Sequence, residues 1–214
     1  MAELGSWPSI RANGLLSTSA LLDLFEKRGR EREEIESQWR PESVRIHHPS
    51  YGVAVIRDQK PLHSGANRFI KGMTPNQYYR LLNGKVFFWA RRERLVSLLG
   101  ARAYKDRPHD VLTVDTKSLV RHHENEITLS PINSGAFFGS GERGSFTFKK
   151  IQDYPYEERR KKNHDDAVVE LAVEYAVKDM TEHVIKVEEW KGNVPLRVVW
   201  ENPAFLKRRE AQDN

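Results

Sequence analysis

The chain has 214 residues, of which 38% are hydrophobic and 10% aromatic, so it holds enough apolar material for a core, and disorder of the whole chain is excluded. No stretch approaches the roughly 18 uncharged apolar residues of a membrane-spanning helix. The sequence contains no cysteine, which excludes disulfides and thiolate chemistry. We therefore expect a cytoplasmic protein without a membrane partner. A net charge of +5 is compatible with a polyanionic partner but does not identify one.

At roughly 150 residues per domain, this length suits one domain, which we place at residues 1–206 with a polar tail over 207–214. The first predicted element is a short helix with Pro8 near its start and Gly14 just past its end. Ser17, Thr18 and Ser19 then offer N-caps to a second helix. We expect that helix to run on into the charged stretch 26–36 as a solvated face.

The middle of the chain predicts short elements that alternate between strands and helices. An apolar run at 53–56 predicts a strand, and a capping box at 74–77 predicts a helix that stops at 83–84. The run 86–89 predicts a buried strand. A helix closed by Gly100, a strand at 111–114 and a short helix capped by Asp115 complete this part.

The last third of the chain combines an irregular segment with strong strands. From 131 to 166 the periodicity disappears, which predicts a long functional or mobile loop. The apolar runs 168–173 and 184–187 predict strands, and 196–200 predicts a last one.

Two charged residues of this frame could carry chemistry. Glu170 interrupts an apolar strand and lies either in a cleft or, the commoner case, on an edge strand where a charge blocks aggregation. Arg57 follows the strand 53–56, where its guanidinium could bind phosphate or form a structural ion pair with Asp58.

Other motifs carry little information by themselves. The histidines lack metal-binding spacing, so we expect no metal site, and we interpret His122 and His123 as surface residues at a helix end. The glycines of 139–144 match a dinucleotide-binding spacing but precede a β-like run, so we interpret them as a flexible loop. The basic stretch 149–162 contains Tyr154 and Tyr156, which could stack bases, although such stretches are more often only solvated.

Six segments stand in order along residues 5 to about 190: Gly5–Ile10, Gly14–Thr18, Ile56–Gln59, Leu81–Trp89, Ile132–Gly135 and Val169–Val173. Together they resemble a bacterial domain family without an assigned activity. That family is in turn similar to the DarT-type ADP-ribosyltransferases, which use NAD to modify bases in DNA. The resemblance implies an α+β fold: one ADP-ribosyltransferase-like domain with split, mostly antiparallel central sheets flanked by short helices.

The resemblance also implies roles for individual residues. Glu170 matches the catalytic glutamate of an "AEFLV"-like strand, and Arg57 matches the arginine that contacts NAD. Leu16, Ser17 and Thr18 would form the edge of the nicotinamide pocket, and Phe88 and Trp89 part of its wall. The acceptor would be read by a loop carrying these residues: Asn133, Ser134, Arg143, Lys149, Lys150 and Tyr154.

The implied activity is NAD-dependent mono-ADP-ribosylation of nucleic acid, with NAD as substrate, no metal, and single-stranded DNA preferred over RNA as acceptor. A toxin or defence role would add an antitoxin as partner. The family pattern has a Tyr-His pair ahead of the first segment, so we expect either a truncated start here or weakened NAD binding. Two alternatives remain, an RNA 2′-phosphate transferase relative and a non-catalytic basic nucleic-acid-binding module.

Overall fold

The computed structural model describes residues 1–60, 62, 64–137 and 141–210, so His63, Gly139, Ser140 and the tail residues 211–214 lie outside the described residues. The chain forms two compact units. Unit 1 comprises residues 1–15, 92–124 and 177–214, and unit 2 comprises residues 16–91 and 125–176. The single domain over 1–206 stays a prediction. The two-residue strands β2 (Leu15–Leu16) and β10 (Ala176–Val177) stand where the chain passes from one unit to the other.

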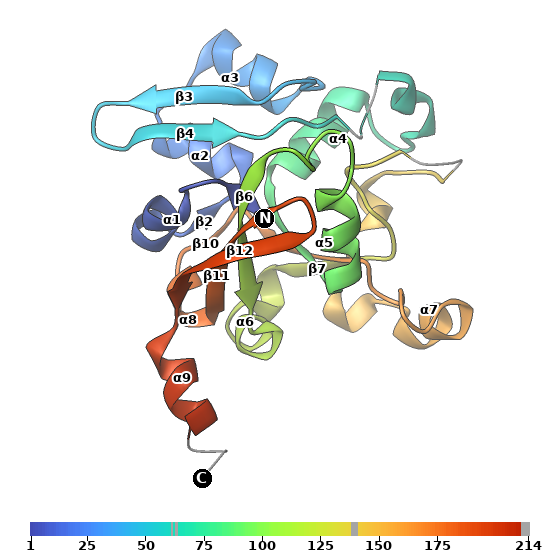
Figure 1. Ribbon diagram of the computed structural model, residues 1–214. Helices are drawn as coiled ribbons and strands as arrows, with labels where there is room; N and C mark the ends of the chain where they lie inside the picture. Colours follow the sequence, from blue (N-terminus) through green and yellow to red (C-terminus); the bar gives the residue numbers. More distant parts are fainter. Residues whose placement is uncertain (61, 63, 138–140, 211–214) are drawn as a thin grey trace. The chain divides into compact units, whose positions relative to one another are not determined.

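Unit 1 is built on an antiparallel four-stranded sheet in the order β1-β6-β11-β12. In Figure 1, the green strand β6 lies beside β11, and the red strand β12 lies on the other side of β11. Its elements are β1 (Ala2–Glu3), α1 (Trp7–Asn13), α5 (Arg92–Leu99), β6 (Pro108–Val114), α6 (Thr116–His123), α8 (Met180–His183), β11 (Val184–Lys191), β12 (Val194–Glu201) and α9 (Pro203–Glu210). Leu99, Val111 and Trp190 form a buried cluster in this unit.

Unit 2 contains a second antiparallel four-stranded sheet, in the order β5-β9-β7-β8, and the hairpin β3-β4, drawn in cyan in Figure 1. Its elements are α2 (Thr18–Leu24), α3 (Gly29–Glu36), β3 (Val44–His48), β4 (Gly52–Ile56), α4 (Pro75–Asn83), β5 (Lys85–Trp89), β7 (Ile127–Ser130), β8 (Lys149–Lys150), α7 (Tyr156–Lys162) and β9 (Glu170–Glu174). Short 3₁₀ turns occupy Ser64–Phe69, Glu124–Glu126, Ser145–Thr147 and Ile151–Asp153.

These two sheets and the short helices confirm the mixed α/β class with antiparallel sheets. Several predicted helix ends are confirmed at atomic detail. Thr74 and Gln77 form the capping box of α4, Ser17 Oγ accepts a hydrogen bond from Ala20 N at 3.1 Å, and Asp115 caps α6. Gly14 ends α1 with φ +85°, a conformation that favours glycine. None of the described helices is both long and apolar enough to cross a membrane.

Two expectations about unit 2 were wrong, and one strand was not predicted. The second helix does not run through 26–36, because α2 ends at Leu24, Glu26 takes φ +55° and α3 starts anew at Gly29. The segment 131–166 is not wholly irregular, since it contains β8 and α7. Strand β3 was missed, although it pairs with β4 from Val44↔Ile56 to His48↔Gly52.

A buried cluster in unit 2 packs α4 against one face of β9. Tyr78, Tyr79 and Leu82 come from α4, and they pack with Phe137 and with Ala172 of β9. Side chains alternate along a strand, so Glu170 and Glu174 share the face of Ala172. The first residue of β9 is therefore directed toward the side of the sheet that α4 covers.

Candidate functional site

Glu170 lies at the start of an interior strand. In β9 it stands opposite Trp89 of β5 on one side and Ser130 of β7 on the other. Only 5% of the Glu170 surface is exposed. The interpretation of this residue as an exposed charge on an edge strand is therefore wrong.

The carboxylate of Glu170 is held by one residue of the following loop. Ser134 donates two hydrogen bonds to Glu170 Oε2, from its backbone N at 3.0 Å and from its Oγ at 2.7 Å. The buried Tyr78 hydroxyl in turn donates to the Ser134 carbonyl at 2.9 Å. This chain of contacts orients the carboxylate from α4 through the loop.

The positive charge of Arg143 acts on Glu170 and on Tyr78, and in both cases it works to lower the pKa. Its guanidinium donates to Gly141 O at 2.7 Å and Ala136 O at 3.0 Å, and it stacks 4.7 Å from the centre of the Phe137 ring. Its Nε is buried and has no hydrogen-bond partner among the described residues. This nitrogen is thus a buried donor without an acceptor among the described residues.

The electrostatics of Glu170 follow from burial. Removal from water disfavours the ionised carboxyl and raises the pKa of Glu170 to about 7, while the Ser134 hydrogen bonds and the Arg143 charge act in the opposite direction. Burial likewise raises the pKa of the Tyr78 hydroxyl. A carboxyl group that titrates near neutral pH is typical of functional sites, although buried structural groups also show such shifts.

The structure brings part of the predicted site together. Ser134 donates a hydrogen bond to Glu170, and the charge of Arg143 acts on it. Trp89 lies opposite Glu170 on the neighbouring strand β5. Phe88, its neighbour, pairs with Leu171 and points to the other face of the sheet. Asn133 precedes Ser134, and its carbonyl accepts a hydrogen bond from Ala136 N at 3.4 Å.

Arg57 lies just past β4, in a different network of contacts. Its carbonyl accepts a hydrogen bond of 2.7 Å from Arg40 Nε. Arg40 is buried and also donates to Ile35 O and Asn83 Oδ1, and burial lowers its pKa to about 10. The sequence analysis missed this buried arginine because a single Arg in a polar stretch carries no local signal.

The predicted edge of the nicotinamide pocket lies next to the C-terminal end of β9. Leu16 ends β2, Ser17 caps α2, and Thr18 is the first residue of that helix. Ser17 N donates to the Tyr175 carbonyl at 2.9 Å. Tyr175 is five residues beyond Glu170, or roughly 16 Å along an extended strand. The structure therefore places this edge and the carboxylate at opposite ends of one strand.

The remaining acceptor residues lie on β8 and after it. Lys149 is exposed, and Lys150 Nζ donates to the Asn125 carbonyl. Tyr154 is buried, with its hydroxyl bonded to Ala167 O, so its ring is not presented for base stacking. Tyr156, at the start of α7, is 48% exposed.

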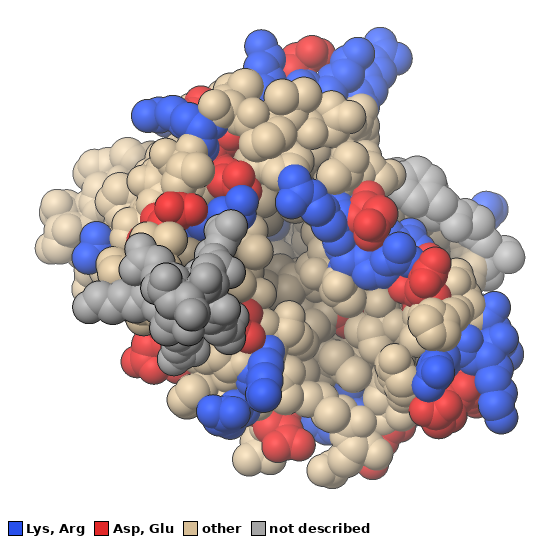
Figure 2. Space-filling model, turned by 60° about the horizontal axis from the view of Figure 1, so that its bottom comes forward, with Lys and Arg blue, Asp and Glu red and all other residues tan. Residues whose placement is uncertain are grey.

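The surface charge around this region is mixed. Along α7, Glu158 pairs with Lys162, and Glu157 with Arg160. The face drawn in Figure 2 likewise shows Lys and Arg interspersed with Asp and Glu. On this face, the excess of basic residues therefore does not form a continuous positive surface.

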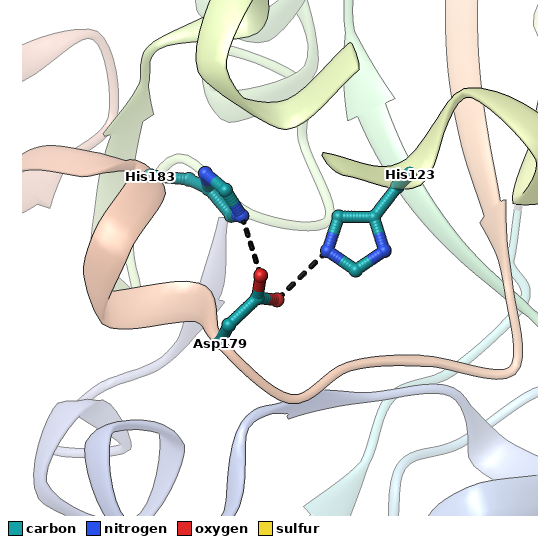
Figure 3. A group of neighbouring side chains, drawn as sticks. All are labelled: His123, Asp179 and His183. Carbon is teal, nitrogen blue, oxygen red and sulfur yellow. Dashed lines mark hydrogen bonds and ion pairs between the residues drawn. The ribbon is translucent and has the colours of Figure 1, made fainter. Parts of the chain in front are cut away.

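A second polar group lies in unit 1, and the sequence analysis missed it. Asp179, just ahead of α8, accepts hydrogen bonds from His123 Nε2 at 2.7 Å and from His183 Nε2 at 3.0 Å (Figure 3). The two histidines end α6 and α8, and His183 is fully buried. The spacing of Asp179 and His183, four residues apart, places them on one side of a helical turn and was the available local signal.

Burial would raise the pKa of Asp179, but the hydrogen bonds from His123 and His183 outweigh it and the pKa is lowered. Ligand atoms of these three residues all lie within 4.8 Å of one another, so the group could hold a metal ion. His122 and His123 were interpreted together as surface residues. His123 is instead half-buried and pairs with Asp179, whereas His122 is exposed.

Comparison with known proteins gives a family but no activity. No curated protein and no solved structure matched the chain. A family model described as a family of unknown function, DUF7002, matches residues 1–184. That stretch includes Glu170 with the residues that orient it, and the group around Asp179. The chain therefore belongs to the DUF7002 family of unknown function.

Proposed function

We propose that the protein is an NAD-dependent mono-ADP-ribosyltransferase with an ADP-ribosyltransferase-like domain, and that Glu170 is its catalytic carboxylate. The observation that carries the proposal is the environment of Glu170: a buried carboxyl at the start of an interior strand, oriented by two hydrogen bonds from Ser134 and opposite Trp89. The order of segments that resembles the DarT-type enzymes supports it independently.

The transfer of ADP-ribose from NAD requires one negative charge positioned near the ribose. When the bond between nicotinamide and ribose breaks, nicotinamide leaves with the bonding electron pair, and positive charge develops on the ribose. A preorganised carboxylate stabilises that charge. The acceptor atom then forms the new bond to the ribose carbon and releases its proton to solvent. Glu170 supplies the charge, and Ser134 keeps its oxygen in place.

The elevated pKa of Glu170 has a direct consequence for this role. At a pKa of about 7, roughly half of the carboxyl groups are protonated at neutral pH, and only the ionised form stabilises the cation. The nicotinamide ring of NAD carries a positive charge, so bound substrate favours the ionised form. We therefore expect activity to rise with pH through about 7.

Other residues take the supporting roles that the resemblance implies. Arg57 contacts the NAD diphosphate, and Trp89, which stands opposite Glu170, lines the nicotinamide pocket. Phe88, on the other face of the sheet, and Leu16, Ser17 and Thr18, at the far end of β9, lie away from this carboxylate and are not part of the proposed pocket. The positive charge of Arg143 acts on Glu170 and favours its ionised form.

We propose a nucleic-acid acceptor, a DNA base in a single strand before RNA. The exposed Lys149 and Lys161 follow the Ser134 loop along the chain and can contact phosphates, whereas Arg160 and Lys162 of α7 pair with Glu157 and Glu158. A toxin or defence role, with an antitoxin as partner, belongs to the same proposal. The mixed charge of α7 predicts modest affinity that falls as salt is raised.

The test is label transfer from adenylate-labelled NAD, with nicotinamide release measured in parallel. Single-stranded DNA, duplex DNA, RNA and lysate protein serve as acceptors. Glu170→Gln keeps the shape of the side chain and removes its charge. Glu174→Gln is the matched control, because Glu174 lies on the same face of β9 but is exposed and paired with Lys85.

We expect wild type and Glu174→Gln to transfer label, and Glu170→Gln to be slower by on the order of 10²–10³-fold. Melting curves establish that all three proteins are folded. Salt-sensitive binding of DNA without any NAD turnover would contradict the proposal and favour the non-catalytic binding module. Turnover that requires a terminal 2′-phosphate on RNA would favour the phosphate-transferring relative.

A further inference from the structure

We propose that His123, Asp179 and His183 form a binding site for a divalent transition-metal cation of the zinc type, in unit 1. The proposed transferase activity does not use these residues. Two imidazoles and a carboxylate are a ligand set that zinc accepts in proteins, with a fourth position left for water. The sequence predicted no metal site, because the three residues stand 56 and 4 positions apart and form no known motif.

The distances fit an ion after a small adjustment. Asp179 lies 2.7 Å from His123 Nε2 and 3.0 Å from His183 Nε2, and all ligand atoms lie within 4.8 Å of one another. Zinc–nitrogen bonds of about 2.0–2.1 Å in a tetrahedron separate the ligand atoms by about 3.3 Å. The two histidine–carboxylate pairs therefore need to open by only about half an ångström.

The two rings are aimed at the two oxygens of one carboxylate, His123 at Oδ1 and His183 at Oδ2. Both direct Nε2 toward the same carboxylate from different helices, as Figure 3 shows. An ionised carboxylate only accepts hydrogen bonds, so in this state both Nε2 atoms carry the proton. When a metal binds, Nε2 gives up this proton, and each neutral ring carries its single proton on Nδ1 instead.

A partner for the second nitrogen is present at His183. Ser118 Oγ lies 2.9 Å from His183 Nδ1, and a hydroxyl can both donate and accept. With Nε2 protonated, the hydroxyl donates to Nδ1. With Nε2 bound to metal, Nδ1–H donates to the hydroxyl. Metal-binding histidines characteristically have such a partner, which orients the ring.

The position of the group permits entry and gives the ion an effect on the fold. His183 is fully buried, but 30% of the Asp179 side chain and 13% of the His123 side chain are exposed. A water can therefore reach the fourth position from the Asp179 side. The ion would join the end of α6 to both ends of α8, so binding should raise the melting temperature of the protein.

The test is a Zn²⁺ titration of tag-free, chelator-treated full-length protein by calorimetry, followed by melting curves with and without Zn²⁺. We expect one ion per chain and a higher melting temperature. Mg²⁺ at the same concentration should neither bind nor compete, because it prefers oxygen ligands.

Three variants locate the site. His123→Gln and Asp179→Asn should each weaken Zn²⁺ binding by at least about 100-fold, and Ser118→Ala by roughly 10- to 100-fold. The matched control is His122→Gln, since His122 is the adjacent exposed histidine of α6 and bonds through Nδ1 to the Ser118 carbonyl. That variant should bind as wild type does.

Two results would overturn the proposal. One is wild-type protein that binds no Zn²⁺ at micromolar concentration, which leaves the group as a hydrogen-bonded structural cluster. The other is equal loss of binding in His122→Gln and His123→Gln. Because the wild-type titration needs no variant and no NAD, its result is independent of how the variants fold and of the proposed transferase activity.

Discussion

Two carboxyl groups of this chain have opposite electrostatic environments. Glu170, in unit 2, is almost fully buried with hydrogen bonds from one serine, and burial raises its pKa to about 7. For Asp179, in unit 1, two histidines donate to the carboxylate, and these bonds outweigh partial burial and lower the pKa. The difference teaches that the charge depends on the extent of burial set against the donors: nearly complete burial prevails at Glu170, whereas the two histidine donors prevail at the partly exposed Asp179.

This contrast separates two kinds of candidate site. A carboxylate that already has cationic or donor partners is stabilised as an anion and is suited to hold a cation in their place. A buried carboxyl with few donors is destabilised as an anion, which a positively charged substrate can relieve. The former fits a metal ligand, and the latter fits a group that stabilises a developing ribosyl cation.

The largest expected effect that tests the contrast is on stability. A raised pKa means that folded Glu170 keeps its proton between about pH 4.5 and 7, where the unfolded chain releases it, so the free energy of unfolding falls as pH rises through this window. Glu170→Gln removes that penalty. Relative to wild type, we expect this variant to gain about 3 kcal/mol between pH 4 and pH 8 in urea unfolding. A difference that does not change with pH would contradict the account.

A smaller effect is expected from Ser134, which stabilises the Glu170 anion with a side-chain hydrogen bond. Ser134→Ala removes the Oγ donor 2.7 Å from Glu170 Oε2, so the pKa of Glu170 should rise further. The pH profile of nicotinamide release should move to higher pH by about one unit, which corresponds to about 1.4 kcal/mol. At pH 9 the rate should approach that of wild type. An unshifted profile would mean that this hydrogen bond does not control the charge.

The smallest effect is expected at the partly exposed Asp179. Its lowered pKa contributes stability that is present above the ordinary value of 3.8 and is lost as pH falls through the lower folded value. Asp179→Asn should therefore reduce the free energy of unfolding at pH 7, in metal-free buffer, by about 1 kcal/mol. The deficit should shrink below pH 4, where wild type also loses the charge. A variant as stable as wild type at pH 7 would show that the ionised Asp179 carboxylate does not stabilise the fold.

Local signals in the sequence predicted much of the fold. Each of these signals spans only a few residues, so it can be recognised directly in the sequence. They are the N-caps Ser17 and Asp115, the capping box at Thr74, and the apolar runs of β5, β9 and β11. The break between α2 and α3 was missed because the positive φ of Glu26 falls on a residue that does not signal a turn, although Gly29, with φ +58°, stands in the same break. Helix α7 was missed because all of its residues are charged except Tyr156 and it buries no apolar face.

The candidate sites depend on contacts between distant residues. Ser134 meets Glu170 across 36 positions because β7 pairs beside β9 and brings the following loop to the start of that strand. His123 meets Asp179 across 56 positions. Such pairs depend on sheet register and helix packing, which a single sequence does not encode in any short motif. The sequence could therefore nominate Glu170 and Ser134 separately, but not the hydrogen bonds by which Ser134 orients the carboxylate.

The most direct test is nicotinamide release from NAD, measured from pH 5 to pH 9 with wild type and Glu170→Gln. The account predicts that the wild-type rate rises through about pH 7 and then levels off, as the carboxyl group ionises. It predicts that the variant stays on the order of 10²–10³-fold slower on the plateau and shows no such rise. Equal rates in the two proteins, with the same dependence on pH, would contradict a catalytic role for Glu170.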